Sequence, residues 1–337
     1  MIKEAILKLS KKENLTYEEA KEVMNEIMSG KATAVQMSSY LTALSMKGET
    51  IEEITGSAAG MRENCIKLLH NMEVLEIVGT GGDNSNSFNI STASAIVIAA
   101  GGVAVAKHGN RAASSKCGAA DVLEELGINI NISPEKSREI LSKINICFLF
   151  AQNYHIAMKY VAPVRKELGI RTVFNILGPL SNPAGANIEL MGVYDESLIE
   201  PLAKVMQNLG VKRGMVVYGT DKIDEISMSS ETKVCEILDK ENLKSYTISP
   251  KDFGYDFCDK KELEGGSVKE NAEIIRNIFN LKDNGAKRKA VCMNAGAGFY
   301  IAKKVKNIKE GVQMAESLID KKKAFEKLED FIKESNS

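Results

Sequence analysis

Apolar residues in the first 70 positions recur at the three- and four-residue spacing of amphipathic helices, beginning with residues 2–9. Thr16 and Thr50 are each followed three positions later by Glu, which is the capping-box pattern of a helix N-terminus. Gly30 and Gly48 stand where two of these helices are expected to end. Residues 1–70 are therefore predicted to form a small all-helical domain.

From residue 71 the pattern changes to short apolar runs that alternate with helical periods. Continuous apolar runs predict buried strands, whereas spaced ones predict helices on the faces of a sheet. The expected fold class is α/β: the small helical domain plus a larger α/β domain, residues 71–337, with a central, mostly parallel sheet flanked by helices. Residues 152–185 carry no strand pattern, and residues 308–333 are predicted to form one amphipathic helix. The predicted strands cover residues 74–78, 103–106, 147–151, 188–193, 214–218, 232–238 and 245–248.

The first predicted strand runs into a glycine-rich turn, residues 79–83 (GTGGD), and hydroxyl and amide side chains fill the segment up to Thr92. Glycines allow positive φ and let an anion approach main-chain N–H groups, and a helix N-terminus adds a positive dipole end. The P-loop pattern fails because Asp83 and Asn84 stand near the place of its Gly-Lys pair, and the dinucleotide pattern fails because it needs Gly at Asn84. An ordinary tight turn would explain the glycines alone. The polar segment behind them favours a phosphate-binding turn.

Two further groups of polar residues follow predicted strands. The second strand leads into a loop, Lys107 to Arg111, that is rich in hydrogen-bond donors and can supply positive charge to a phosphate. Asp224 and Glu225 follow the strand at residues 214–218. The carboxyl ends of parallel strands meet at the ligand-binding edge of a sheet, and paired carboxylates suit Mg²⁺. A pair of solvated loop acids is an equally acceptable interpretation of these two residues.

Three blocks, Gly79 to Asp83, Asn89 to Thr92 and Lys107 to Arg111, resemble in order and spacing those of the anthranilate phosphoribosyltransferases, and residues 174–183 (FNILGPLSNP) continue the match. The resemblance covers essentially the whole chain. It implies transfer of the phosphoribosyl group of 5-phosphoribosyl 1-diphosphate (PRPP) to the amino group of anthranilate in tryptophan biosynthesis, with Mg²⁺ as cofactor. It also implies that part of residues 155–185 joins the helical domain, and that the protein is a homodimer through that domain.

The same resemblance assigns roles to individual residues. Asp224, Glu225 and the hydroxyl of Ser91 would hold the metal. Arg165 and Asn110 would meet anthranilate, with Gly79 at the boundary between the two substrates and His108 lining the acceptor's channel; without the resemblance, Arg165 would pass for a surface arginine. The residues expected to bind PRPP are Gly79, Gly82, Asp83, Ser87, Asn89, Ile90, Ser91, Thr92, Lys107, His108, Gly109, Asn110, Arg111, Ala112, Ala113, Ser114, Ser115 and Ala119.

Several residues near these blocks need separate treatment. Ala119 stands where the family usually has Ser, so only a backbone contact is expected there, and Ile156 replaces a common Pro. His70 is expected to be structural, and His155 is a candidate for capping or lining the site. Cys117 lies in the ligand segment, but no His accompanies it locally, so a role as nucleophile is not favoured.

Composition narrows the range of partners and compartments. The chain has 44 Lys and Arg against 45 Asp and Glu, a net charge of −1, which gives no expectation of a nucleic-acid or membrane partner. No apolar run approaches the roughly 20 residues of a membrane span, and no signal-peptide pattern opens the chain. The six cysteines are far apart and are expected to be reduced, which favours the cytoplasm.

Two alternative functions remain open from the sequence. A pyrimidine nucleoside phosphorylase would share the fold and a glycine turn, but residues 107–111 and the Asp224-Glu225 pair favour the PRPP enzyme. A non-catalytic paralogue that binds nucleic acid would need a basic surface, and the near-zero net charge argues against one.

Overall fold

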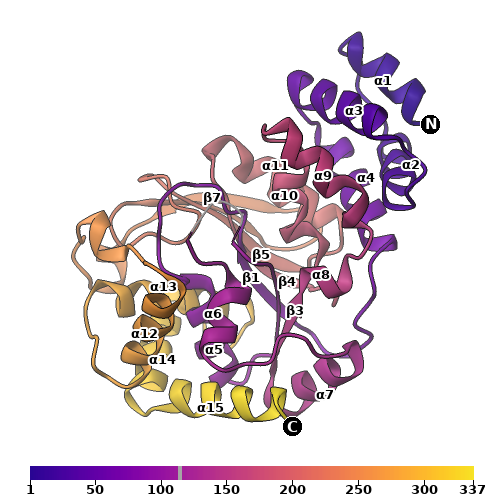
Figure 1. Cartoon of the computed structure of the whole chain (residues 1–337). Helices are drawn as coiled ribbons and strands as arrows, with labels where there is room; N and C mark the ends of the chain where they lie inside the picture. The colour runs from indigo at the N-terminus through magenta and orange to yellow at the C-terminus, as the bar shows by residue number, and fades with distance from the viewer. Residues whose placement is uncertain (113–115) are drawn as a thin grey trace.

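The computed structural model describes residues 1–112 and 116–337 (Figure 1). The chain opens with four helices: α1 (Ile2–Ser10), α2 (Tyr17–Met28), α3 (Ala34–Lys47) and α4 (Ile51–Glu63). The side chains of Thr16, Thr33 and Thr50 each accept a hydrogen bond from the N–H of the third helical residue, whose own side chain accepts one in return. The predicted capping boxes are confirmed, and Thr33 adds a third.

Seven strands form one sheet in the order β3-β2-β1-β4-β5-β6-β7. Neighbours from β3 to β5 run parallel, whereas β6 and β7 are antiparallel, so the predicted mostly parallel sheet is confirmed. β1 and β4 lie side by side although β2 and β3 separate them in sequence, and ligands bind at the carboxyl ends of strands at such a switch point. The strands are β1 (Leu75–Gly79), β2 (Val105–Gly109), β3 (Ile146–Phe150), β4 (Ile188–Gly192), β5 (Arg213–Gly219), β6 (Thr232–Ile237) and β7 (Leu243–Ile248).

Helices cover both faces of this sheet (Figure 1). On one face α5 (Ile90–Ala100) packs on β1 and β2, and α13 (Ala286–Ile301) packs on β4 and β5. On the other face α11 (Ile199–Asn208) packs on β5 and β6 and also contacts α4. The remaining helices are α6 (Ala119–Glu125), α7 (Pro134–Ile144), α8 (Ala151–Tyr154), α9 (Met158–Leu168), α10 (Phe174–Leu177), α12 (Val268–Phe279), α14 (Ile308–Asp320) and α15 (Lys323–Ser335).

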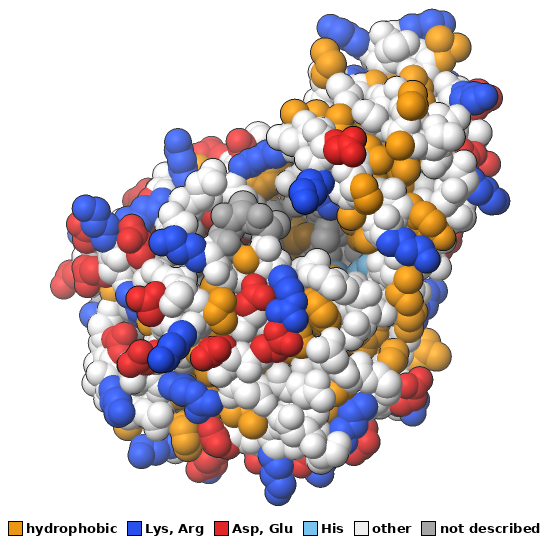
Figure 2. All heavy atoms as spheres, in the orientation of Figure 1, with side chains coloured by type: hydrophobic (Ala, Val, Ile, Leu, Met, Phe, Trp, Pro, Cys, Tyr) orange, Lys and Arg blue, Asp and Glu red, His pale blue; other side chains and the backbone are white. Residues whose placement is uncertain are grey.

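A second segment of the chain packs on the N-terminal helices. α9 contacts α2 and α3, and α10 contacts α4. Val161 and Phe174 belong to the same hydrophobic core as Met24 and Leu41 of the N-terminal helices. We call α1–α4, α9 and α10 together the helical lobe. In the space-filling view, the surface is hollowed where this lobe meets the rest of the molecule (Figure 2).

Two predicted elements differ from the structure. The second strand starts and ends later than predicted, so Lys107, His108 and Gly109 belong to β2 and not to a loop. The predicted single helix at residues 308–333 is wrong, because the chain breaks between α14 and α15 at Lys322, which has φ +58°. Among the described residues, no helix combines the length and the apolar character needed to cross a membrane.

Candidate functional site

The loop that carries Asp224 lies against the carboxyl ends of β1 and β4. A Cβ at Gly79 would stand 2.3 Å from Asp224 Oδ2, and a Cβ at Gly192 would stand 1.6 Å from the Asp224 carbonyl oxygen. Gly79 and Gly192 are register partners at the ends of the two strands. Both strands therefore end in glycine because the acidic loop takes the space that a side chain would fill.

The glycine turn presents main-chain N–H groups. Gly81, Gly82 and Asn84 have φ of +70°, +72° and +58°. The Gly81 N–H donates to Asp224 Oδ2 at 2.7 Å, which ties the turn to the acidic loop. Among the described residues, nothing accepts a hydrogen bond from the N–H groups of Gly82, Asp83 or Asn84. Successive free N–H groups in a turn of this kind form a concavity that binds anions, as the sequence predicts for this turn.

The first turn of α5 contributes the next polar groups. The Ser91 N–H donates to Glu225 Oε1 at 3.1 Å, and the Ser91 hydroxyl accepts from Lys107 Nζ at 3.2 Å. Asn89 Oδ1 and Thr92 Oγ1 are buried and have no hydrogen-bond partner among the described residues. The side chain of Ile90, by contrast, lies in the hydrophobic core. Ile90 therefore anchors the turn, and its side chain does not face the site.

Lys107 and His108 are buried within β2. Lys107 Nζ donates to the Ile77 carbonyl oxygen at 2.7 Å as well as to Ser91, and burial lowers its pKa. The His108 ring lies beside the His155 ring, with centroids 5.0 Å apart and planes tilted by 50°. Burial first, and then the neighbouring imidazole, lower the pKa of His108 to about 3, so its ring is neutral at physiological pH. Among the described residues, nothing bonds its Nε2.

The segment after β2 turns toward α6. Arg111 forms ion pairs with Asp121 at 3.0 Å and Glu124 at 2.5 Å, so these two carboxylates share the charge that the sequence analysis assigns to a phosphate. Asp121 also accepts from the Ala112 N–H at 2.8 Å. The Asn110 side chain accepts from Gln152 at 3.4 Å. Gly109 lies against Ala119, since an added Cβ would stand 3.1 Å from the Cβ of that residue. Ala113, Ser114 and Ser115 lie outside the described residues.

The acidic loop and the glycine turn bring three carboxylates together. Burial first, and then repulsion by Asp83, raise the pKa of Asp224 to about 7. Burial and the adjacent Asp224 raise the pKa of Glu225 well above its usual range. Within residues 1–112 and 116–337, none of the three carboxylates forms an ion pair with Lys or Arg. Lys107 lowers the pKa of Glu225 only in part, and the negative charge that remains at the two buried carboxyls favours a bound cation.

The donor set is nevertheless sparse for a metal. Among the described residues, no group of three or more His, Cys, Asp or Glu side chains is arranged so that it could coordinate a metal ion by itself. Mg²⁺ keeps several waters and takes one or two carboxylates together with substrate phosphates, so a pair of carboxylates beside a phosphate-binding turn fits it. The residues present therefore fit Mg²⁺ held jointly by protein and ligand.

Arg165 lies on α9 in the helical lobe. Its guanidinium stands 5.1 Å from the centre of the Phe174 ring, and burial lowers its pKa. No hydrogen bond or ion pair joins it to another described residue. A partly buried guanidinium with free donors suits a carboxylate ligand, because its planar fork can bond both oxygens.

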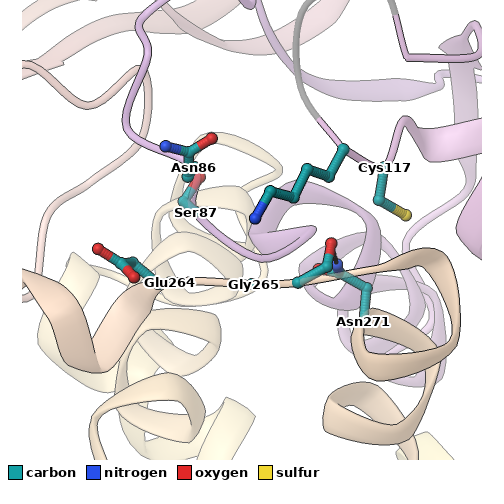
Figure 3. A pocket seen from close by; sticks show the side chains of 8 residues that line it. Asn86, Ser87, Cys117, Glu264, Gly265 and Asn271 are labelled. Atoms are coloured by element: carbon teal, nitrogen blue, oxygen red, sulfur yellow. Dashed lines mark hydrogen bonds between the residues drawn. The ribbon is translucent and has the colours of Figure 1, made fainter.

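Ser87 lines a small cavity together with Asn86 and Glu264 (Figure 3). The cavity has a volume of about 70 Å³. Asn271 is 2% exposed, its Oδ1 has no partner among the described residues, and its amide points into the cavity. Asn271 is not among the residues predicted from the sequence, although the Gly265-Gly266 pair before it is a local signal of a close backbone approach. The lining residues are Asn86, Ser87, Lys116, Cys117, Glu264, Gly265, Gly266 and Asn271.

Comparison with known proteins defines the class to which this fold and site belong. Residues 71–325 match the α/β domain of a glycosyl transferase family, and residues 3–65 match the helical bundle domain of the same family. The anthranilate phosphoribosyltransferase of Methanobrevibacter smithii is 61% identical over 337 residues, which is the full length of both chains.

Similar solved structures belong to the same family as this relative. The anthranilate phosphoribosyltransferase of Thermus thermophilus superposes with a TM-score of 0.94 at 42% identity and covers 99% of each chain. The Saccharomyces cerevisiae enzyme in complex with PRPP and Mg superposes with a TM-score of 0.91 at 29% identity, covering 99% of this chain and 98% of that one. The chain belongs to the anthranilate phosphoribosyltransferase family.

Proposed function

We propose that the protein transfers the 5-phosphoribosyl group of PRPP to the amino group of anthranilate, giving N-(5-phosphoribosyl)anthranilate and pyrophosphate, as a step of tryptophan biosynthesis. The observation that carries this proposal is the position of three free N–H groups, Gly82 to Asn84, beside the buried pair Asp224 and Glu225. One side of this site suits an anion and the other a cation, as a diphosphate with its metal requires.

The predicted PRPP residues act in two ways in this proposal. The N–H groups of the turn, with Asn89 and Thr92, bind phosphate oxygens and the sugar. Lys107 places a buried ammonium group behind Ser91, because its Nζ donates to the Ser91 hydroxyl at 3.2 Å. Ser91, Asp224 and Glu225 would hold Mg²⁺, which supplies positive charge to the pyrophosphate oxygens when bound.

The acceptor side would use the helical lobe and the end of β2. Arg165 has free donors for the anthranilate carboxylate, and Asn110 directly follows the last residue of β2. The neutral ring of His108 offers a flat wall for an aromatic acceptor without placing a charge beside it. Within the described part of the chain, no hydrogen bond or ring contact joins Arg165 to these two residues, so in this proposal the ligand itself bridges them.

The chemistry follows from these positions. The bond between ribose C1 and the pyrophosphate oxygen breaks while a bond forms from the anthranilate nitrogen to C1, and the nitrogen then releases a proton to solvent. An aryl amine carries a free lone pair at neutral pH, so the reaction needs no strong base. The protein contributes by holding both substrates in line and by stabilising the charge of the leaving group.

The test is pyrophosphate release from PRPP with Mg²⁺, measured with and without anthranilate. We expect release that depends on both. A folded protein that releases no pyrophosphate in the presence of anthranilate would refute the proposal. Uridine with inorganic phosphate serves as a control for phosphorolysis and is expected to give no ribose 1-phosphate.

The proposal also includes a homodimer through the helical lobe, in the cytoplasm, with residues 1–70 and part of 155–185 as one domain. Leu7, Val35 and Met46 are 59%, 76% and 83% exposed, and apolar side chains are frequent on the visible face of the lobe (Figure 2). Light scattering after gel filtration is expected to show a dimer that Val35→Glu with Met46→Glu converts to a monomer. Leu69→Glu, at a residue 72% exposed outside the lobe, is the matched control and should leave the dimer intact.

A further inference from the structure

Arg171 connects the helical lobe with the glycine turn. Its backbone lies between α9 and α10, and its carbonyl oxygen accepts from the Ser45 hydroxyl of α3 at 3.0 Å. Its side chain contacts the glycine turn, where Nη2 donates to the Gly82 carbonyl oxygen. One residue thus touches a helix of the lobe with its main chain and the phosphate-binding turn with its guanidinium.

The aromatic ring of Tyr194 packs against the guanidinium of Arg171. The Arg171 Cζ stands 3.9 Å from the centre of the Tyr194 ring, which is a close cation–π contact. Tyr194 is itself fixed to the turn, because its N–H donates to Thr80 Oγ1 at 3.1 Å. Thr80 in turn donates its N–H to the Gly192 carbonyl oxygen at 2.9 Å. The residue that packs against the Arg171 guanidinium is therefore itself bonded to the glycine turn, which is bonded in turn to the end of β4.

The bond to Gly82 sets the direction of the next peptide N–H. In a trans peptide, the C=O of one residue and the N–H of the next point in opposite directions. Because the Gly82 C=O points to Arg171, the Asp83 N–H points away from it. That N–H has no acceptor among the described residues. A glycine with φ of +72° does little to hold its own peptide plane. The N–H groups of Ser85 and Asp224 hold the Asp83 carboxylate, and the guanidinium is the described group that bonds the Gly82–Asp83 peptide itself.

We infer that Arg171 is a positioning residue for the phosphate-binding turn: it holds the Gly82–Asp83 peptide in the orientation that binds the diphosphate, and it makes this orientation depend on the packing of the helical lobe. The inference rests on the proposed function, since it assigns Arg171 to the diphosphate side of the site and not to the acceptor side.

The test compares Arg171→Ala with the natural protein in steady-state kinetics. Loss of one charge-assisted hydrogen bond is expected to raise KM for PRPP about tenfold. KM for anthranilate and the thermal midpoint should not change, because Arg171 is exposed and is not part of the buried hydrophobic core. Added guanidinium ion should lower the KM for PRPP of Arg171→Ala and leave that of the natural protein as it is. Arg138→Ala, at an exposed arginine of α7, is the matched control and should behave like the natural protein.

Tyr194 provides a second, independent variant. Tyr194→Leu removes the ring under the guanidinium and should raise KM for PRPP in the same direction as Arg171→Ala, whereas Tyr194→Phe should have no effect. Equal rises in both KM values, an unchanged KM for PRPP in Arg171→Ala or Tyr194→Leu, or a lower thermal midpoint without any change in KM would each overturn the inference.

Calorimetry separates this inference from the proposed function. Binding of pyrophosphate with Mg²⁺ to the natural protein and to Arg171→Ala needs no acceptor and no turnover. If anthranilate does not support pyrophosphate release but Arg171→Ala binds pyrophosphate about tenfold more weakly, the proposed function fails and the role of Arg171 stands. Equal pyrophosphate affinity of the two proteins would refute the role of Arg171 even where the transferase assay succeeds.

Discussion

Gly79→Ala tests whether the position of the Asp224 carboxylate matters for the reaction. The backbone at Gly79 suits an L-residue, because its φ is not positive, so the substitution adds a methyl group without backbone strain. That methyl would stand 2.3 Å from Asp224 Oδ2 and 2.7 Å from its Cγ. The carboxylate must then move by about 1 Å to reach an ordinary contact distance. It would also lose its hydrogen bond from the Gly81 N–H, now 2.7 Å long.

Misplacement of a reacting or metal-holding group by about 1 Å costs on the order of 100-fold in rate. We therefore expect kcat for pyrophosphate release, at saturating PRPP and anthranilate, to fall by about that factor, together with a higher Mg²⁺ requirement. The thermal midpoint should change little, since Gly79 is the last residue of strand β1 and lies outside the apolar core.

The matched control is Gly285→Ala, whose added methyl would approach only the Asp283 side chain, at 3.2 Å, before α13. It is expected to retain full activity. A Gly79→Ala protein with the kcat and Mg²⁺ dependence of the natural protein would refute the reasoning, because the acidic loop could then move without consequence.

Three other outcomes are expected. Asp224→Asn combined with Glu225→Gln should abolish Mg²⁺-dependent turnover and preserve the circular dichroism spectrum; unchanged activity would remove the metal assignment. Arg165→Ala should raise KM for anthranilate far more than KM for PRPP, the reverse of Arg171→Ala, and equal rises would show that Arg165 does not bind the acceptor. Burial, with repulsion from Glu76, raises the pKa of Glu189 from 4.5 to about 8, so the folded state holds this proton more tightly than the unfolded chain does. The free energy of unfolding should therefore fall as pH rises between these values, and calorimetry of Glu189→Gln should show a shallower fall; an identical slope would contradict the assignment.

The glycine turn and the acidic pair could be predicted because their signals are local. Gly79 to Asp83 is a contiguous motif after an apolar strand, and Asp224-Glu225 directly follows another. The fold class followed from the alternation of strands and helices. These features depend on spacing along the chain, which the sequence displays directly.

Other features depend on contacts between distant residues and could not be predicted in this way. Lys107 looked like a loop cation, but the Ile77 carbonyl and the Ser91 hydroxyl provide acceptors that keep it within a buried strand. Arg111 looked free for a phosphate, but α6 places Asp121 and Glu124 beside it. The break at Lys322 carries no Gly or Pro, so the helical period appeared continuous across it.

The role of Arg171 could not be predicted from the sequence either, because its contacts join residues that are distant along the chain. Its contacts reach Gly82, Ser45 and Tyr194, which lie 89, 126 and 23 positions away along the chain. No local pattern distinguishes it from Lys159, Arg165 and Lys166 of the neighbouring helix α9. The residue could be recognised only after the helical lobe had been placed against the turn.

The helical lobe is built from two segments of the chain that are synthesised at different times, because β1, β2 and β3 lie between them in the sequence. α9 and α10 complete the core of the first four helices, yet β1, β2 and β3 leave the ribosome before them. Until that point the nascent chain exposes the apolar surface that Val161 and Phe174 later cover. Such a surface is a target for chaperones and for association with other nascent chains. A fragment that stops before α8 would keep this surface exposed permanently.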